Sequence, residues 1–271
     1  MFYKEVIVWK RLQHPNIVPF LGVPAKIPPF EIVYYWMENN RITEYVRQNP
    51  KVDRVSLVSE FISTPITSFE RRTPQLWDIA DGLHYLHSCN IIHGNLKGVS
   101  RFVPHSRLFQ SRMLISTNSK ANVLIDGDGR ARLMDFGLTS VTQGETSIVS
   151  PQDPNMTNTT TWAAPEILKG APASEEGDVF TFAMVAVEVC TVGEQRFCIS
   201  RLTCLGQTFT GSPPFVSNYQ AAVFGIMDGK RPGRPAILDH EGLWKIINGC
   251  WSEEPRVRPT SSQLLEFFQK S

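Results

Sequence analysis

The order of several short polar motifs limits what this chain can fold into more than any other feature of its sequence. Each motif taken alone is weak evidence for any particular fold or function, and an isolated Asp-Phe-Gly is most simply explained as a turn. The set comprises His93, Asn95 and Lys97 in HGNLKG, Asn122 in ANVLIDGDG, DFG at 135–137, APE at 164–166, Asp178 in an apolar stretch and Arg258 in CWSEEPRVRPT. A chance match to the whole ordered set is far less probable than a match to any one member, so the motifs are interpreted together.

Local patterns predict helices and strands between these motifs. Apolar residues at helical spacing predict helices, stretches rich in β-branched and aromatic residues predict strands, and an Asp-Gly pair between two apolar runs predicts a hairpin. The predicted helices cover 2–12, 41–48, 76–89, the buried segment 177–190 and most of the last 35 residues; the predicted strands cover 17–23, 31–37 and the two arms of 121–135; the polar stretch 139–161 is predicted to be a loop.

Taken in this order, the motifs resemble those of the protein-kinase family. Leu96-Lys97 is most similar to the tyrosine-kinase-like serine/threonine group, and the resemblance extends over nearly the whole chain. It implies an α+β, bilobal protein-kinase-like fold. Residues 1–38 would be the remnant of a truncated N-lobe, with one helix and about two strands, and residues 39–271 would form a mainly α-helical C-lobe. The implied cofactors are ATP and Mg²⁺, and the implied partner is a protein.

The resemblance also implies roles for the polar motifs in phosphoryl transfer. Asp135 would hold the Mg²⁺ that bridges the phosphates, and Asn122 would hold a second ion, because carboxylates and amides supply the hard oxygen ligands that Mg²⁺ prefers. Lys97 would stabilise the transferring phosphoryl group. Glu166 and Arg258 would form a buried ion pair that anchors the larger lobe. Asp178 would accept hydrogen bonds from the backbone of the catalytic loop.

The nucleotide side of this expected site is incomplete. Glu5 lies nine residues before His14, the family spacing for a helix glutamate that pairs with a strand lysine. Neither that lysine nor a Gly-rich loop is found in the sequence, which begins after the region where both would lie. Met37 falls in the expected hinge and Tyr34 at the gatekeeper position, so part of an adenine pocket is expected to survive, with weakened ATP binding.

Asn95 is the main departure from the family pattern, because an active relative has aspartate at this position. An amide is neutral and has no useful basicity near pH 7, so it cannot accept the proton of a substrate hydroxyl. Loss of a general base typically reduces the rate by roughly 10²–10⁴-fold. Gly94 stands where the family has an arginine that pairs with a phosphorylated activation loop. We therefore expect impaired transfer and no activation through that contact.

Three segments interrupt the family spacing, near 55–75, 99–120 and 192–207. Each opens with valine followed by serine or glycine, and the corresponding codons resemble a 5′ splice donor, so one hypothesis is that all three are translated introns. The alternative is genuine insertion into surface loops, which folded domains tolerate. The segment 99–120 would push Asn95 and Asn122 apart unless it loops out. A smaller lobe of two strands would also be marginal, with an uncovered edge.

Three functions remain open from the sequence. The first is a protein kinase acting on serine, threonine or tyrosine; the second is a pseudokinase that serves as a binding scaffold; the third is a mis-spliced, non-functional product. The 27 basic and 26 acidic residues give a net charge near +1, so bulk charge favours neither nucleic acid nor an anionic membrane as a partner. The odd number of cysteines, five, lacks metal-ligand spacing and is typical of a cytoplasmic protein with reduced thiols. No pattern in the sequence indicates an oligomeric state.

Overall fold

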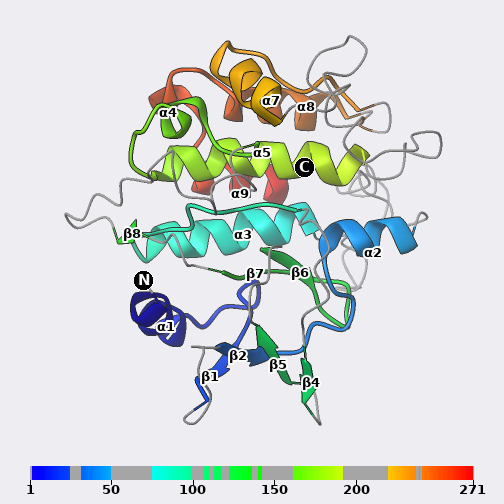
Figure 1. Cartoon of the computed structure of the whole chain (residues 1–271). Helices are drawn as coiled ribbons and strands as arrows, with labels where there is room; N and C mark the ends of the chain where they lie inside the picture. The colour runs from blue at the N-terminus through cyan, green and yellow to red at the C-terminus, as the bar shows by residue number, and fades with distance from the viewer. Residues whose placement is uncertain are drawn as a thin grey trace.

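The computed structural model of the chain has two lobes with a hairpin between them (Figure 1). We call them the sheet lobe, which contains helix α1 and strands β1, β2, β5 and β4, and the helical lobe, which contains α3, α5 and the later helices. The predicted α+β, bilobal architecture is thereby confirmed. The described residues are 2–24, 32–49, 75–98, 107–109, 113–116, 122–135, 140–141, 161–191, 219–235, 238 and 240–270.

One aromatic side chain holds α1 (Phe2–Arg11) against β1 (Phe20–Gly22) and β2 (Ile32–Tyr35). Trp9 is buried, and its ring centroid lies 6.0 Å from that of Tyr34 in β2. Its indole Nε1 donates a hydrogen bond of 2.6 Å to the carbonyl oxygen of Val18, just before β1. The helix and both strands predicted for this region are present, and both strands are shorter than predicted.

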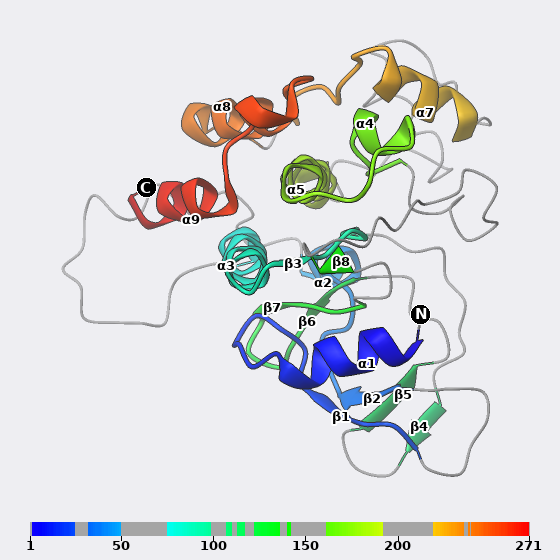
Figure 2. The same ribbon diagram turned by 90° about the vertical axis from the view of Figure 1, so that its left-hand side faces the viewer.

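The sheet of this lobe has four strands in the described part of the chain, in the order β1-β2-β5-β4 (Figure 2). β5 (Met113–Ser116) pairs antiparallel with β2, and β4 (Arg107–Phe109) pairs with the other side of β5. Both added strands belong to the segment 99–120, which the sequence indicated only as an interruption. The expected uncovered edge is therefore wrong for β2, because this strand has a neighbour on each side.

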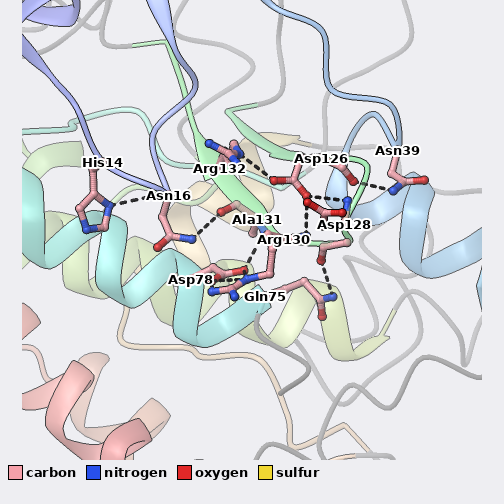
Figure 3. Close-up of polar contacts among 11 residues, drawn as sticks. His14, Asn16, Asn39, Gln75, Asp78, Asp126, Asp128, Arg130, Ala131 and Arg132 are labelled. Carbon is pink, nitrogen blue, oxygen red and sulfur yellow. Dashed lines mark hydrogen bonds and ion pairs between the residues drawn. The ribbon is translucent and has the colours of Figure 1, made fainter. Parts of the chain in front are cut away.

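A polar network fixes the hairpin of β6 (Val123–Ile125) and β7 (Ala131–Leu133) on the helical lobe (Figure 3). At its turn, Asp126 Oδ1 accepts from the backbone N–H groups of Asp128 and Arg130, at 3.0 and 2.9 Å. The buried carboxylate of Asp78, in α3 (Gln75–Ser88), accepts from the backbone N–H of Ala131 at 2.8 Å and pairs with the Arg130 guanidinium. These bonds make the hairpin a rigid support, because both its turn and one arm are tied to α3.

The same hairpin is also held by three side-chain amides, one from the first residue of α3 and two from other segments (Figure 3). The side-chain amides of Asn16, Gln75 and Asn39 donate to backbone carbonyl oxygens of the hairpin. The two arms pair in register from Val123 opposite Leu133 to Ile125 opposite Ala131. The Asp-Gly hairpin expected from the sequence is thus present, and its open end faces the residues expected at the site.

The helical lobe is built around α5 (Glu175–Thr191), which is buried at every position from Gly177 to Cys190. A helix that is apolar on all sides can only be accommodated inside a lobe, as the sequence predicted. α3 and α9 (Ser261–Lys270) pack against each other. The other described elements are α2 (Ile42–Gln48), β3 (Ile91–Ile92), β8 (Ser140–Val141), α4 (Pro165–Leu168), α7 (Tyr219–Met227), α8 (Glu241–Cys250) and the 3₁₀ helix η3 (Pro255–Val257).

Several predictions fall outside the described residues: those for 55–74, 192–207, Phe136-Gly137 and most of the polar stretch 139–161. Within that stretch, Ser140–Val141 is described as strand β8, which pairs with β3. Among the described helices, none combines the length and the apolar character needed to cross a bilayer. Cys89 and Cys250 are free thiols.

Candidate functional site

The hairpin β6–β7 brings Asn122 and Asp135 together at its open end. Asn122 directly precedes β6, and Asp135 follows β7 by two residues. The backbone N–H of Met134 donates to the carbonyl oxygen of Asn122 at 3.0 Å, which extends the ladder to the residue next to Asp135. The two residues expected to hold metal therefore flank the open end of a single hairpin.

Asn95 connects these residues to Lys97 through side-chain hydrogen bonds. The Lys97 ammonium donates to Asn95 Oδ1 at 3.2 Å, and Asn95 Nδ2 donates to Asp135 Oδ2 at 3.3 Å. The side-chain amide of Asn122 donates to the backbone carbonyl oxygen of Asn95. The structure thus brings together four residues that the sequence analysis singled out, in spite of the long segment between Asn95 and Asn122.

The orientation of the Asn95 amide follows from the chemistry of its neighbours. An ammonium can only donate, so the oxygen of Asn95 faces Lys97, and its NH₂ group faces the carboxylate of Asp135, which accepts. An aspartate at the same position would instead present an oxygen to Asp135 and repel it. The asparagine therefore stabilises a network without a divalent cation, and it brings no proton acceptor of useful basicity to it.

The oxygen atoms at this end of the hairpin fit a hard divalent cation. Asn122 is buried, and its side-chain Oδ1 has no hydrogen-bond partner among the described residues. A buried acceptor without a partner is unfavourable, and Mg²⁺ or Ca²⁺ would satisfy it. Asp135 has a positive φ of 65°, a conformation that is uncommon for residues other than glycine and that recurs at active and ligand-binding sites.

The loop 93–98, which carries Asn95 and Lys97, is anchored on Asp178 at the start of α5. Asp178 Oδ2 accepts from the backbone N–H of His93 at 2.8 Å, and Oδ1 accepts from that of Gly94 at 2.8 Å. His87 Nε2 also contacts Asp178 Oδ2, at 3.0 Å. Gly94 has a φ of 71°, a left-handed conformation that glycine adopts without the penalty of a Cβ atom.

A second anchor joins α4 to the C-terminal helices through Arg258. Both terminal nitrogens of Arg258 donate to the carboxylate of Glu166, at 2.6 and 2.8 Å. The same guanidinium donates to the carbonyl oxygens of Ser252 and Glu176 and lies over the ring of Phe180, 5.1 Å from its centroid. The pair expected from the sequence is therefore formed, bidentate and largely buried.

The two residues expected on the nucleotide side lie near this site but differ in their environment. Met37 is buried, and its carbonyl oxygen accepts from the backbone N–H of Asn40 at 3.0 Å. Burial, and to a smaller extent the negative charge of Asp135, raises the pKa of Glu5 to about 7. Among the described residues, no basic side chain forms an ion pair with Glu5, so its charge is not compensated there.

The sequence analysis missed Glu188, which lies beneath the loop 93–98. Its Oε2 accepts from the indole Nε1 of Trp162 at 2.9 Å, and burial in α5 raises its pKa to about 8 although Trp162 and the backbone of Gly98 oppose the shift. A Cβ atom on Gly98 would come within 2.6 Å of this carboxyl group. An acidic residue in the apolar second half of α5 is the sequence signal that could have identified it.

Comparison with known proteins places these residues in a family context. A family model for protein tyrosine and serine/threonine kinases matches residues 1–106 and 117–268. The serine/threonine-protein kinase STY17 of Arabidopsis thaliana is 26% identical over 269 residues, which are 99% of this chain and 37% of that protein. The serine/threonine/tyrosine-protein kinase HT1 of Arabidopsis thaliana is 29% identical over 99% of this chain and 54% of its own length. A probable serine/threonine-protein kinase of Dictyostelium discoideum, DDB_G0272254, is 28% identical over 100% of this chain and 16% of its length. The chain thus spans about half or less of these relatives.

Proposed function

Because this chain belongs to the protein tyrosine and serine/threonine kinase family, we propose that it binds ATP and Mg²⁺ and is impaired in transferring phosphate to protein hydroxyl groups. Serine and threonine are the favoured acceptors, since all three relatives described above have serine/threonine in their names; tyrosine is also named for HT1. The whole protein is proposed to act in the cytoplasm on a protein substrate or binding partner. Its nearly balanced charge favours a protein over nucleic acid or a membrane surface.

One observation carries this proposal: the amide of Asn95 occupies the space between Lys97 and Asp135. It donates to Asp135 and accepts from Lys97, so both of its polar ends are used within the protein. Mg²⁺, when bound, would neutralise charge on the phosphates, with Asn122 and Asp135 as its protein ligands. A substrate hydroxyl would then meet a neutral amide, which can orient it but cannot take its proton.

The surroundings of this amide support the same proposal. A pocket beside Asn95 is lined by residues 94–96, by Trp162 and Ala163 and by the first turns of α5, and it could receive the acceptor side chain. On the nucleotide side, Met37 would contact the adenine. Glu5, with a pKa near 7 and no basic partner among the described residues, would leave the phosphates poorly positioned. We therefore expect weak binding as well as slow transfer.

The test compares the chain with Asn95→Asp and with the double variant Asn95→Asp, Asp135→Asn. Mg²⁺-dependent ATP binding is measured by calorimetry, and transfer is followed with ATP labelled in its γ-phosphate. We expect binding with little turnover in the parent chain and a gain of about 10²-fold in turnover for Asn95→Asp, the low end of what a general base contributes. The double variant should lose both. Turnover of 1 s⁻¹ or more in the parent chain, a rate typical of kinases at about 1–100 s⁻¹, would contradict the proposal.

A binding scaffold is the second candidate, and the intact anchors at Asp178 and Arg258 favour it. These contacts maintain the helical lobe whether or not transfer occurs. If Asn95→Asp binds Mg²⁺ and ATP as tightly as the parent chain but shows no gain in turnover, the scaffold function is the better one. A mis-spliced product without function would instead lack a cooperative thermal transition.

A further inference from the structure

We propose that the segment between Gly98 and Asn122 is a structural element of this protein: its hairpin β4–β5 completes the sheet lobe and ties the catalytic loop to the hinge at Met37. The family model matches the chain up to residue 106 and again from residue 117. The unmatched residues 107–116 are those that contain β4 and β5. The inference rests on backbone pairing and does not depend on whether the site transfers phosphate.

The pairing of β5 with β2 is regular along the whole of β2. Each of its four residues has a partner, from Ile32 opposite Ser116 to Tyr35 opposite Met113. β5 is paired on its other side as well, since Ile115 faces Val33 in β2 and Arg107 in β4. A segment that merely interrupted the chain would have no reason to match the edge of β2 residue by residue.

This pairing solves a physical problem of the sheet lobe. β1 and β2 alone would form a two-stranded ribbon, which is marginally stable in water, and β2 would expose unpaired N–H and C=O groups along one edge. With β5 and β4 added, β2 becomes an interior strand of a four-stranded sheet. The hairpin thus supplies, from a segment that follows Gly98, two of the four described strands of this sheet.

The described residues that flank the segment, Lys97 before it and Asn122 after it, are hydrogen-bonded to each other at the site. The backbone N–H of Asn122 donates to the carbonyl oxygen of Lys97 at 3.3 Å, and its side-chain amide donates to that of Asn95. At Gly98, the last described residue before the segment, the backbone carbonyl oxygen accepts from the hydroxyl of Thr43 in α2 at 3.4 Å. The base of the segment is therefore closed by hydrogen bonds.

The far end of the hairpin lies next to the hinge. Met113 is opposite Tyr35, which is only two residues before Met37. The segment that follows Asn95 and Lys97 in the chain thus contains a strand, β5, that pairs with β2, the strand that leads into the hinge. A displacement of β5 would be transmitted to Met37 through β2, whereas an ordinary catalytic loop has no covalent connection to this sheet edge.

Two variants of the full chain test the proposal by hydrogen exchange and mass spectrometry. The first deletes 99–120, which joins Gly98 to Ala121 and restores the family spacing. The second, Ile115→Pro, keeps the length but removes a backbone N–H from a strand that is paired on both sides. In both we expect exchange at residues 32–35 to rise by about tenfold or more, because an edge strand loses its protection. Ile115→Val, which keeps the N–H, should leave exchange unchanged.

Peptides from α5 serve as the internal reference. Faster exchange at 32–35 with unchanged exchange in α5 supports the proposal. Global unfolding of the deletion variant, with Ile115→Val folding normally, also supports it, because an insertion without a structural role can be removed without loss of stability. A deletion variant that is as stable as the parent, with unchanged protection at 32–35, would overturn it and would favour the translated-intron hypothesis. Neither outcome depends on phosphate transfer, so the proposed function can fail or hold independently.

Discussion

The charged residues singled out from the sequence have hydrogen-bonded partners in the helical lobe, whereas the one in the sheet lobe has no ion-pair partner among the described residues. In the helical lobe, the buried carboxylate of Asp178 accepts two backbone hydrogen bonds and contacts His87, and Arg258 is paired with Glu166 through two hydrogen bonds. In the sheet lobe, Glu5 is partly buried without an ion-pair partner among the described residues, and its pKa is raised to about 7. The contrast indicates that the charged residues that anchor the helical lobe are paired within the protein, whereas Glu5, which was expected on the nucleotide side, has no such pair among the described residues.

The largest expected effect is on the pair that holds the helical lobe. Arg258→Met leaves the Glu166 carboxylate without its partner and should reduce the free energy of unfolding by about 3–5 kcal/mol, the usual cost of breaking a buried ion pair. Urea denaturation at pH 7 measures this value. Arg256→Met is the matched control, because Arg256 lies in the same 3₁₀ turn but is exposed. A loss below about 1 kcal/mol in Arg258→Met would remove the contrast between the lobes.

A smaller loss of stability is expected for Asp178→Asn. Both oxygens of Asp178 accept from N–H donors, so an amide would direct its NH₂ group at a donor in either orientation. Loss of charge-assisted hydrogen bonds should cost about 2–3 kcal/mol, and exchange of the amides of His93 and Gly94 should accelerate. The exposed Asp228→Asn is the control. Unchanged exchange at His93 and Gly94 would mean that Asp178 does not anchor the loop.

The sequence was informative wherever structure depends on local pattern. α5 was predicted because its residues are apolar on every side, and the hairpin β6–β7 because an Asp-Gly turn separates two apolar arms. The grouping of Asn95, Lys97, Asn122 and Asp135 was predicted from their resemblance to an ordered set of motifs; their roles stay predictions. These inferences needed no knowledge of which distant segments meet.

The sequence was not informative where a pairing joins distant segments. Ile115 and Val33 are 82 positions apart, and no local pattern in either strand specifies the other. The departure of 99–120 from family spacing was visible, but spacing cannot distinguish an idle insertion from one that pairs with a sheet edge. Glu188 was overlooked for a related reason, since its partner Trp162 approaches from another part of the chain.

Glu188 is an exception to this contrast, because it is a buried acidic residue of the helical lobe that bonds to Trp162 and to no basic side chain among the described residues, and a pH experiment tests it. Because its folded-state pKa is raised from 4.5 to about 8 by burial, the folded state binds a proton more tightly than the unfolded state. The contribution of this residue to stability is therefore fully present below about pH 4.5 and is lost as the pH rises through about 8. Between pH 6 and 7 the free energy of unfolding of the parent chain should fall by about 1 kcal/mol, as measured by urea denaturation. Glu188→Gln should not show this fall. Equal slopes in the two proteins would mean that Glu188 is ionised in the folded state.

The smallest expected effect is on the pKa of Glu5, the residue of the sheet lobe on which the contrast between the lobes rests. Asp135→Asn removes a negative charge near Glu5, so the pKa of Glu5 should fall, by roughly half a unit to one unit. It should stay above 4.5, since burial is the larger cause of its shift. Titration of the side-chain carboxyl carbon of Glu5 by NMR measures this change, with the exposed Asp128→Asn as control. If Glu5 in the parent chain instead titrates near 4.5, a basic group must compensate its negative charge. The sheet lobe would then pair this charge as the helical lobe pairs Asp178 and Arg258, and the weak nucleotide binding expected here would lose its main physical cause.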